Sequence, residues 1–198
     1  MTKRVVHQAE LAPAVLAAAR SGDQQAFAAL VEHYDPRLRA LAYHLLADPH
    51  ETDDALQDTY VKVYKGLQGF AGDAALSTWL TRITYTTCMD LLRRRSHVVP
   101  LPDLEPEHSL PQAPDPTDDL SSRSTVRNAL CRLPPEQRAV VVLVGVQGLD
   151  YRQAGEILGV PSGTVASRLS SARKTLRNSL RGGDEPLVVT DRIEEVSS

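Results

Sequence analysis

The stretch that most limits what this chain can fold into is residues 149–180, which have the pattern of two short helices joined by a tight turn. Asp150 can cap the first helix, because its carboxylate accepts amide hydrogens that the first turn leaves unpaired. Gly159 follows Leu158 at the point where the chain needs a left-handed residue to end that helix. We therefore expect a helix over residues 150–158 with a turn directly after it.

A second helix is expected from Ser162, which can serve as its cap, to the end of the stretch. Its apolar residues recur at helical spacing: Val165, Leu169, Ala172, Leu176 and Leu180. Ala154 and Gly155 are small enough to let the two helices cross closely. This arrangement is a helix-turn-helix, whose second helix can lie in the major groove of DNA.

Charge decides whether this helical hairpin is expected to touch DNA, because many hairpins with the same spacing do not. Residues 162–181 contain five basic side chains and no Asp or Glu. A solvated helix normally mixes both signs, whereas a helix that faces phosphates lacks carboxylates. The net charge of the chain is −3, yet residues 123–181 hold ten basic and three acidic side chains. The charge distribution therefore favours DNA binding by the second helix.

Proline and acid content divides the chain into two domains. Residues 97–122 hold six prolines and six acids, with no Lys or Arg, and show little periodicity. Such a segment cannot bury enough apolar area to fold alone, so we expect a flexible, acidic, proline-rich linker. It separates a domain at 11–96 from a second at 123–181, with a flexible N-terminus at 1–10 and an acidic tail at 182–198.

Both domains are expected to be small helical bundles, which makes the fold class all-α. The expected helices of the first domain are residues 11–20, 23–34, a third from Pro36 to the break at Asp48-Pro49, 51–67 and 77–95. In the second domain a helix at 124–133 and another begun by Pro134-Pro135 precede the helix-turn-helix. Aromatic residues make up only 5% of the chain, which fits small cores.

The helix expected at 51–67 has two contrasting faces. Leu56 and Val63 belong to an apolar stripe that can pack inward, whereas Asp54, Gln57 and Asp58 form an acidic, amide-bearing surface. By itself that surface is typical of an ordinary solvated face.

The loop that follows this helix, residues 66–76, contains one aromatic residue, Phe70, which we expect to be exposed. In the next helix, Trp79 shares an apolar stripe with Ile83, which favours a core position over a wedge between DNA strands.

The sequence offers little for catalysis or for membranes. No nucleophile–base pairing, glycine-rich phosphate loop or metal-ligand cluster is visible, so we expect no enzymatic activity, no metal and no cofactor. Cys88 and Cys131 have no ligand partners nearby and fit disulfide-free folding in the cytoplasm. No apolar run is long enough to span a bilayer, so no membrane insertion is expected.

Three motifs, in this order, make the chain resemble a sigma factor of bacterial RNA polymerase, in the extracytoplasmic-function (ECF) group of the sigma-70 family. Residues 53–60 (DDALQDTY) are similar to the family's acidic helix. Residues 77–95 resemble its promoter-melting helix. The motif LPPEQR at 133–138, followed by GTVASRL at 163–169, resembles the start and the recognition helix of its second domain. Together these motifs cover roughly residues 11–181.

The resemblance implies a sigma factor that directs promoter-specific transcription initiation. Its first domain (region 2) would recognise and melt the −10 element, and its second (region 4) would bind the −35 element through the helix-turn-helix. The implied partners are core RNA polymerase, through its β and β′ subunits, promoter DNA and an anti-sigma factor.

The three motifs assign the family's functional residues to positions in this chain. Those implied to dock on the β′ clamp helices are Asp54, Gln57 and Asp58. Those implied at the −10 element are Phe70, Arg82, Tyr85, Thr86, Met89, Arg93 and Arg94. Those implied at the −35 element are Ser162, Thr164, Ser167, Arg168, Ser171, Arg173 and Lys174.

The chain departs from the family at several of these positions. The family usually has Asn near Thr86, Arg where Ala71 stands, and basic or imidazole side chains at Ala166, Ser170 and Ser171. We therefore expect a −35 interaction that is weaker or has a different sequence preference.

The alternative hypothesis is a stand-alone helix-turn-helix regulator whose first domain binds an effector or dimerises. Such a regulator does not require the acidic, amide-bearing face of the helix at 51–67.

Overall fold

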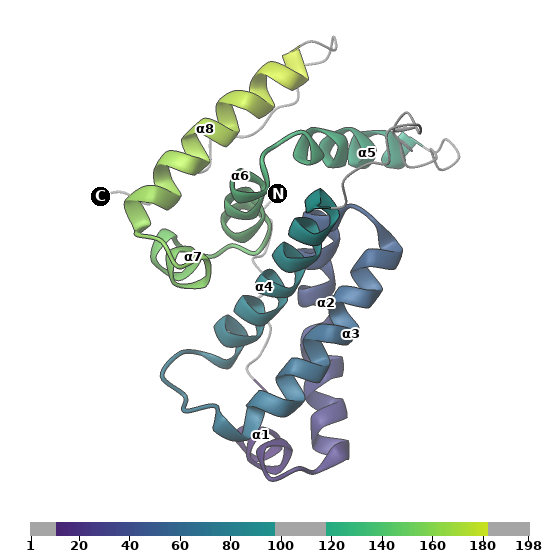
Figure 1. Cartoon of the computed structure of the whole chain (residues 1–198), viewed down its shortest axis with the longest axis vertical. Coiled ribbons are helices and arrows are strands. Elements are labelled where there is room, and N and C mark those ends of the chain that lie inside the picture. Colours follow the sequence, from purple (N-terminus) through teal and green to yellow (C-terminus); the bar gives the residue numbers. More distant parts are fainter. Residues whose placement is uncertain (1–10, 98–117, 182–198) are drawn as a thin grey trace.

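The computed structural model describes residues 11–97 and 118–181, and all regular elements in these two ranges are helical (Figure 1). The first range holds α1 (Pro13–Arg20), α2 (Gln24–Leu46), α3 (Pro49–Gly66), a 3-10 turn η1 (Leu67–Gly69) and α4 (Leu76–His97). The second holds α5 (Asp118–Cys131), α6 (Pro135–Val141), a π-helical turn η2 (Val142–Val146), α7 (Tyr151–Leu158) and α8 (Ser162–Arg181). The predicted all-α class is confirmed. The N-terminus at 1–10, most of the expected linker and the tail at 182–198 lie outside the described residues.

The predicted break before Pro36 is wrong, because α2 runs through this proline as one helix. Its buried apolar residues continue on both sides of the proline: Leu30, Tyr34, Leu38, Leu41 and Leu45. Pro36 lacks the amide hydrogen that would bond the carbonyl of Glu32, but both residues are exposed, so water can reach that carbonyl. Packing of the continuous stripe therefore overrides the local proline signal.

The turn around η1 is organised by Trp79. Its half-buried ring packs on the apolar core and against Phe70, with the ring centroids 5.1 Å apart. A Cβ at Gly66 would lie 3.2 Å from the same indole, so glycine lets α3 approach it. These contacts support the core position favoured for Trp79. Phe70 is buried by the same packing and only 8% exposed, so the expected exposure of this residue is wrong.

The helix-turn-helix forms as the local signals predict. Asp150 Oδ1 accepts from the Gln153 amide at 2.7 Å, and the Gln153 side chain accepts from the Asp150 amide. Gly159 ends α7 with φ +68°, the left-handed conformation expected of it. One boundary differs from expectation, because α5 begins at Asp118, inside the segment predicted to be linker. The expected helix after Pro134-Pro135 is present as α6.

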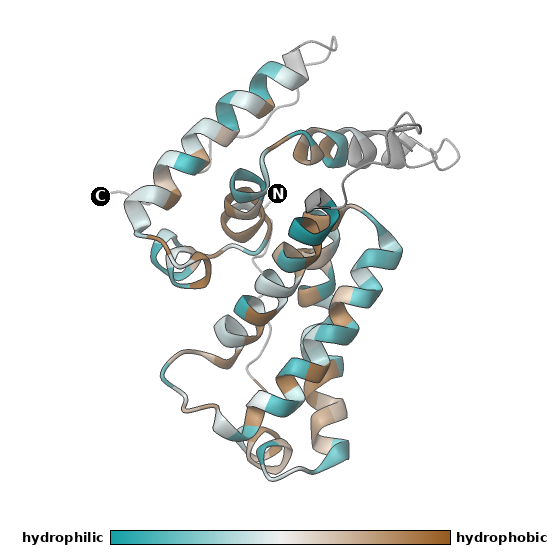
Figure 2. Cartoon of the chain, in the orientation of Figure 1, coloured by the Kyte–Doolittle hydropathy of each residue, from teal (hydrophilic) through white to brown (hydrophobic). Residues whose placement is uncertain are grey.

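The two helical groups share an apolar core, with α4 against α7 and α2 against η2 and α6 (Figure 1). One buried cluster includes Leu38, Leu41 and Leu45 of α2 together with Val140 and Leu143 of the second group. A smaller cluster of Leu130, Leu133 and Ala172 holds α5 on α8. Figure 2 shows apolar and polar residues alternating along the helices, as expected of helices that bury one side.

Candidate protein and nucleic-acid interfaces

The outward side of α3 presents the predicted acidic and amide side chains. Asp54, Gln57 and Asp58 are all exposed, whereas Leu56 and Val63 on the opposite side are buried. Asp48 fixes the start of this helix, because its side chain accepts the Glu51 amide at 2.9 Å. The predicted division of α3 into two faces is confirmed.

Two apolar residues that we did not predict as site residues extend this face. Val61 and Tyr64 are 49% and 48% exposed and follow Asp58 at the spacing of one helix face. The Tyr64 ring meets Phe27 edge-on at 5.0 Å, beside a groove of about 720 Å³ between α2 and α3. Exposed apolar side chains beside a polar rim are typical of a protein-binding surface. The face is hereafter called the α3 surface, made of Asp54, Gln57, Asp58, Val61 and Tyr64.

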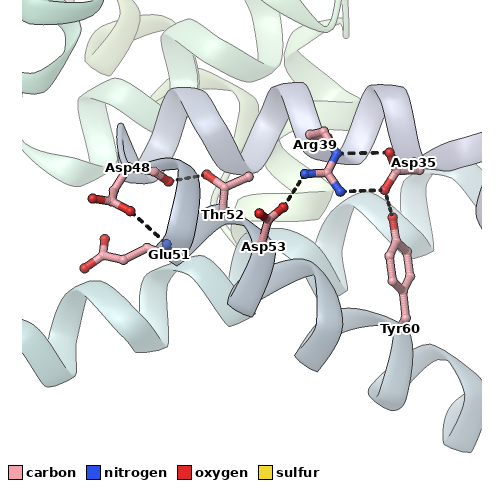
Figure 3. Close-up of polar contacts among 7 residues, drawn as sticks. All are labelled: Asp35, Arg39, Asp48, Glu51, Thr52, Asp53 and Tyr60. Atoms are coloured by element: carbon pink, nitrogen blue, oxygen red, sulfur yellow. Dashed lines mark hydrogen bonds and ion pairs between the residues drawn. The ribbon is translucent and has the colours of Figure 1, made fainter. Parts of the chain in front are cut away.

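A hydrogen-bonded network joins the base of the α3 surface to α2 (Figure 3). Arg39 donates from Nε to Asp35 Oδ2 at 3.1 Å and from Nη1 to Asp53 Oδ1 at 2.5 Å. The Tyr60 hydroxyl donates to Asp35 Oδ1 at 2.7 Å. Burial alone would raise the pKa of Asp35, but the hydrogen bonds from Arg39 and Tyr60 outweigh it and lower that pKa. The network holds α3 in a fixed position on α2.

Replacing Arg39 with alanine will lower the free energy of unfolding by about 1–2 kcal/mol at pH 7, because two carboxylates lose a shared donor. The hydrogen bonds depress the pKa of Asp35 in the folded state. The stabilisation that they provide is therefore present above the ordinary aspartate pKa of about 3.9, and it is lost as the pH falls through the lower pKa of the folded state. Urea unfolding at pH 7 and at about pH 3 measures both effects.

The matched control for this substitution is Arg152→Ala, which breaks the exposed Arg152–Glu156 pair on α7. Its expected cost is about 0.3–0.5 kcal/mol, as for other exposed pairs one helical turn apart. Equal losses for Arg39→Ala and the control would contradict the positioning role of the network.

Four of the residues predicted for the −10 element are open to solvent on α4. Arg82, Thr86, Arg93 and Arg94 are exposed, as their predicted contacts with the −10 element require. Arg93 pairs with Asp90 at 3.3 Å, and the Thr86 hydroxyl donates to a carbonyl of its own helix at 2.9 Å.

Three other residues predicted for the −10 element are covered. Phe70 packs against Trp79, and Met89 is only 9% exposed. Tyr85 is half-buried, and burial together with the nearby Glu136 carboxylate raises its pKa. The sequence pattern did not reveal this burial: Phe70 is covered by Trp79, and Tyr85 lies near Glu136 of the second helical group.

The exposed side of α8 carries short hydroxyl side chains and few long ones. Ser162, Ser167, Ser171 and Lys174 are exposed, and Thr164 is half-buried. Two further residues, Arg177 and Asn178, are exposed farther along the helix and were not among the predicted site residues.

Two of the predicted basic residues of α8 turn away from that exposed side. Arg168 pairs with Glu136 of α6 at 2.5 Å, and its side chain is only 27% exposed. Arg173 is half-buried, with its Nη2 atom enclosed. The accessible side of α8 is therefore less basic than the sequence count suggested.

The described residues contain no group of three His, Cys, Asp or Glu side chains arranged to hold a metal ion. Within residues 11–97 and 118–181, no helix combines the length and the apolar character needed to cross a membrane.

Comparison with known proteins matches both halves of the chain. Residues 30–98 match the family model "Sigma-70 region 2", and residues 123–176 match "Sigma-70, region 4". The ECF RNA polymerase sigma factor SigM of Mycobacterium tuberculosis is 40% identical over 164 residues, covering 82% of this chain and 81% of the relative. SigW of Bacillus subtilis, another ECF sigma factor, is 29% identical and covers 82% and 92%.

Two solved structures resemble the fold over most of its length. CnrH in complex with the cytosolic domain of CnrY aligns with a TM-score of 0.65 and 27% identity, over 87% of this chain and 97% of that one. The sigma factor RpoE of Bartonella quintana, in complex with the anti-sigma factor NepR, aligns with a TM-score of 0.62 and 26% identity, over 78% and 96%.

Proposed function

The chain belongs to the sigma-70 family of bacterial RNA polymerase sigma factors, in its ECF group, and on this basis we propose which of its surfaces meet polymerase and promoter DNA. A sigma factor recognises promoters for RNA polymerase, and that is the function of this chain. We propose that it has no catalytic activity of its own and works in the cytoplasm. The proposed region 2 and region 4 domains are residues 11–96 and 123–181, and the start of α5 at Asp118 supports a slightly earlier onset of the second.

The α3 surface is the proposed docking site for the clamp helices of the polymerase β′ subunit. Exposure of its polar residues and the position of Val61 and Tyr64 support this assignment, since protein interfaces combine an apolar centre with a polar rim. The Arg39 network supports it further by fixing α3 before the partner binds, which reduces the entropy lost on association.

The exposed residues of α4 are the proposed contacts with the −10 element. Arg82, Arg93 and Arg94 would hold strand phosphates, and Thr86 lies on the same side of the helix. Tyr85 and Met89 remain proposed contacts, because bases that leave the stack need an apolar or aromatic surface. Tyr85 lies near Glu136 and Arg168 of the second domain, so its contact with DNA would require that domain to move away. Phe70 would then stabilise the loop by packing against Trp79.

The exposed side of α8 is proposed to meet the −35 element mainly through Ser167 and Ser171, which can reach bases, and Lys174, which can hold a phosphate. Each good bidentate contact with a base contributes about 1–3 kcal/mol of discrimination, and this side offers few long donors. A weak −35 preference is therefore expected, with binding that depends on the polymerase. Linking two weak DNA contacts through one scaffold raises the effective concentration of the second.

Replacing Lys174 with alanine will weaken promoter binding by the polymerase–sigma complex about 3- to 10-fold, with little change in sequence preference. One phosphate contact is lost, so the slope of log affinity against log salt concentration falls by about one. Filter binding between about 50 and 200 mM salt measures both quantities. Arg20→Ala on α1 is the control, since it removes an exposed charge far from α8. A loss restricted to one −35 sequence would instead make Lys174 a base-reading residue.

An anti-sigma factor is a further proposed partner. One solved relative is held by a protein named as an anti-sigma factor, and another by a cytosolic domain. A protein that covers the α3 surface would compete with the polymerase for it.

Run-off transcription with purified core polymerase and a pool of genomic promoter fragments tests the proposed function. Transcripts that start at defined sites only when the protein is added would support it and reveal the promoter sequence. Operator binding by the protein alone, without polymerase binding or initiation, would indicate a stand-alone regulator.

A further inference from the structure

The exposed side of α8 carries positive charge that no carboxylate of its own helix balances. Its exposed residues recur three or four positions apart and so share one side: Ser167, Ser170, Ser171, Lys174, Thr175, Arg177 and Asn178. Residues 162–181 contain no Asp or Glu. Within residues 11–97 and 118–181, neither Lys174 nor Arg177 has an ion-pair partner. These two cations therefore face solvent.

The free positive charge of α8 lies mainly in its second half. Arg168, nearer the start of the helix, pairs with Glu136, so its charge is balanced locally. Arg173 is half-buried, and its enclosed Nη2 atom has no hydrogen-bond partner among the described residues. The last turns of α8, yellow in Figure 1, extend away from α6 and α7. Lys174 and Arg177 are thus accessible to an anionic partner.

The residues that follow α8 in the chain carry the opposite charge. The acidic tail, residues 182–198, contains five acids and one basic residue, for a net charge of −4 at pH 7. The acids are Asp184, Glu185, Asp191, Glu194 and Glu195. Opposite charges on neighbouring segments attract, and salt weakens this attraction when the groups are exposed.

The covalent connection brings the acidic tail within reach of α8. The tail begins directly after Arg181, the last residue of the helix, with Gly182 and Gly183. Glycine accepts positive and negative φ with similar ease, so the chain can reverse its direction at this point. The 20 residues of α8 span about 30 Å, whereas the 15 residues from 184 to 198 can span about 50 Å when extended. The tail is therefore long enough to pass along the whole helix.

Other exposed surfaces suit the acidic tail less well. The α3 surface carries carboxylates of its own and repels the tail. At the end of α4, Arg93 pairs with Asp90 and Arg95 with Glu51, so carboxylates already balance two of its three arginines. The exposed side of α8 combines unbalanced cations with the shortest tether, and a short tether gives an effective concentration of about millimolar.

A carboxylate-rich segment on this side of α8 would occupy groups that are proposed to meet DNA. Lys174 is the proposed phosphate contact, and Ser171 lies beside it. Carboxylate and phosphate oxygens are both anionic acceptors for the same donors. Non-specific DNA binding depends on phosphate contacts, whereas promoter binding adds contacts with bases. Occupation by the tail should therefore suppress non-specific binding more than promoter binding.

We propose that the acidic tail binds the exposed side of α8 and competes there with the phosphates of DNA. The contact protects the helix from non-specific DNA, and promoter DNA that the polymerase holds close to α8 displaces the tail. The competition rests on the proposed function, because it requires α8 to meet DNA. The contact between tail and helix needs neither DNA nor polymerase.

Nuclear magnetic resonance of the whole chain tests the contact. The neutral-tail variant keeps the length of the tail and removes its negative charges: Asp184→Asn, Glu185→Gln, Asp191→Asn, Glu194→Gln and Glu195→Gln. At about 50 mM salt, the signals of Lys174 and Arg177 should differ between wild type and this variant, and the difference should fade by about 300 mM. The signals of Arg20 on α1 are the control and should coincide. Differences that grow with protein concentration would indicate a contact between two copies and overturn the proposal.

Binding of a mixed-sequence DNA duplex tests the competition without a known promoter. The neutral-tail variant should bind the duplex about 5-fold more tightly than wild type at about 50 mM salt, and nearly equally at about 300 mM. Loss of negative charge can raise DNA affinity without any contact, so the comparison is repeated with Lys174→Ala and Arg177→Ala in both proteins. There the neutral tail should change the affinity by less than about 1.5-fold. An equal increase with and without these two cations would overturn the proposal.

The outcomes separate this inference from the proposed function. Unchanged α8 signals in the neutral-tail variant, or an unchanged affinity for a duplex that wild type binds, overturns the inference while the sigma function stands. Changed α8 signals in proteins that do not bind DNA would support the contact and overturn both the competition and the proposed DNA contact of α8. Failure of run-off transcription would overturn the proposed function and leave the measured contact in place.

Discussion

Replacing Gln57 and Asp58 together with alanine will reduce promoter-directed run-off transcription about 30- to 1,000-fold at limiting polymerase. Both side chains are exposed on α3 beside Val61 and Tyr64. The two side chains adjoin the apolar centre formed by Val61 and Tyr64, and we expect loss of both contacts to cost about 2–4 kcal/mol of binding free energy, which corresponds to that range. Titration of core polymerase against fluorescent protein measures the affinity directly, and run-off transcription measures its consequence.

The double substitution should leave thermal unfolding unchanged, since neither side chain is buried. Gln24→Ala with Gln25→Ala, two exposed polar positions at the start of α2, is the matched control and should transcribe normally. Normal transcription by the Gln57/Asp58 variant would show that polymerase does not bind the protein through the α3 surface.

Replacing Gly155 with valine will unfold the helix-turn-helix. A Cβ at this position would lie 2.6 Å from the Val160 carbonyl oxygen and 3.6 Å from the Ser162 amide nitrogen. These are backbone atoms of the turn, so they cannot move aside without separating α7 from α8. We expect a cost of about 3–5 kcal/mol, a large part of the total stability of a small domain.

Circular dichroism should show a melting temperature lower by more than about 10 °C, with DNA binding lost. The matched control is Gly145→Val, because a Cβ at Gly145 meets nothing within 4 Å. Retention of the wild-type melting temperature by Gly155→Val would mean that the turn can shift to accept a side chain.

Features with a local cause were predictable from the sequence. Asp150 and Gly159 specify the ends of α7 through their own backbone and side-chain chemistry, and both act as expected. The proline signal at Pro36 is equally local, yet α2 continues through it because residues on both sides pack into one core. Long-range packing decided that outcome, and no short window of sequence contains it.

The candidate site divides in the same way. The polar side of α3 was visible as a periodic pattern, but Val61 and Tyr64 were missed because apolar residues are ordinarily assigned to the core. Phe70 was expected to be exposed and is buried, because its neighbour Trp79 folds over the loop. Tyr85 of α4 lies near Glu136 and Arg168 of the second domain, and that proximity depends on how two separately patterned halves meet.

The π-helical turn η2 determines the direction in which the next residue, Gln147, projects from the helix. The Gln147 amide bonds the Val142 carbonyl at 2.9 Å, five residues back rather than four. One residue corresponds to about 100° of rotation in an α-helix, so a regular helix would carry Gln147 to a different side. The length of this one turn therefore aims Gln147 at Arg37. A lineage could retune the contact between the domains by gaining or losing a single residue here, while α4 and α8 keep their sequences.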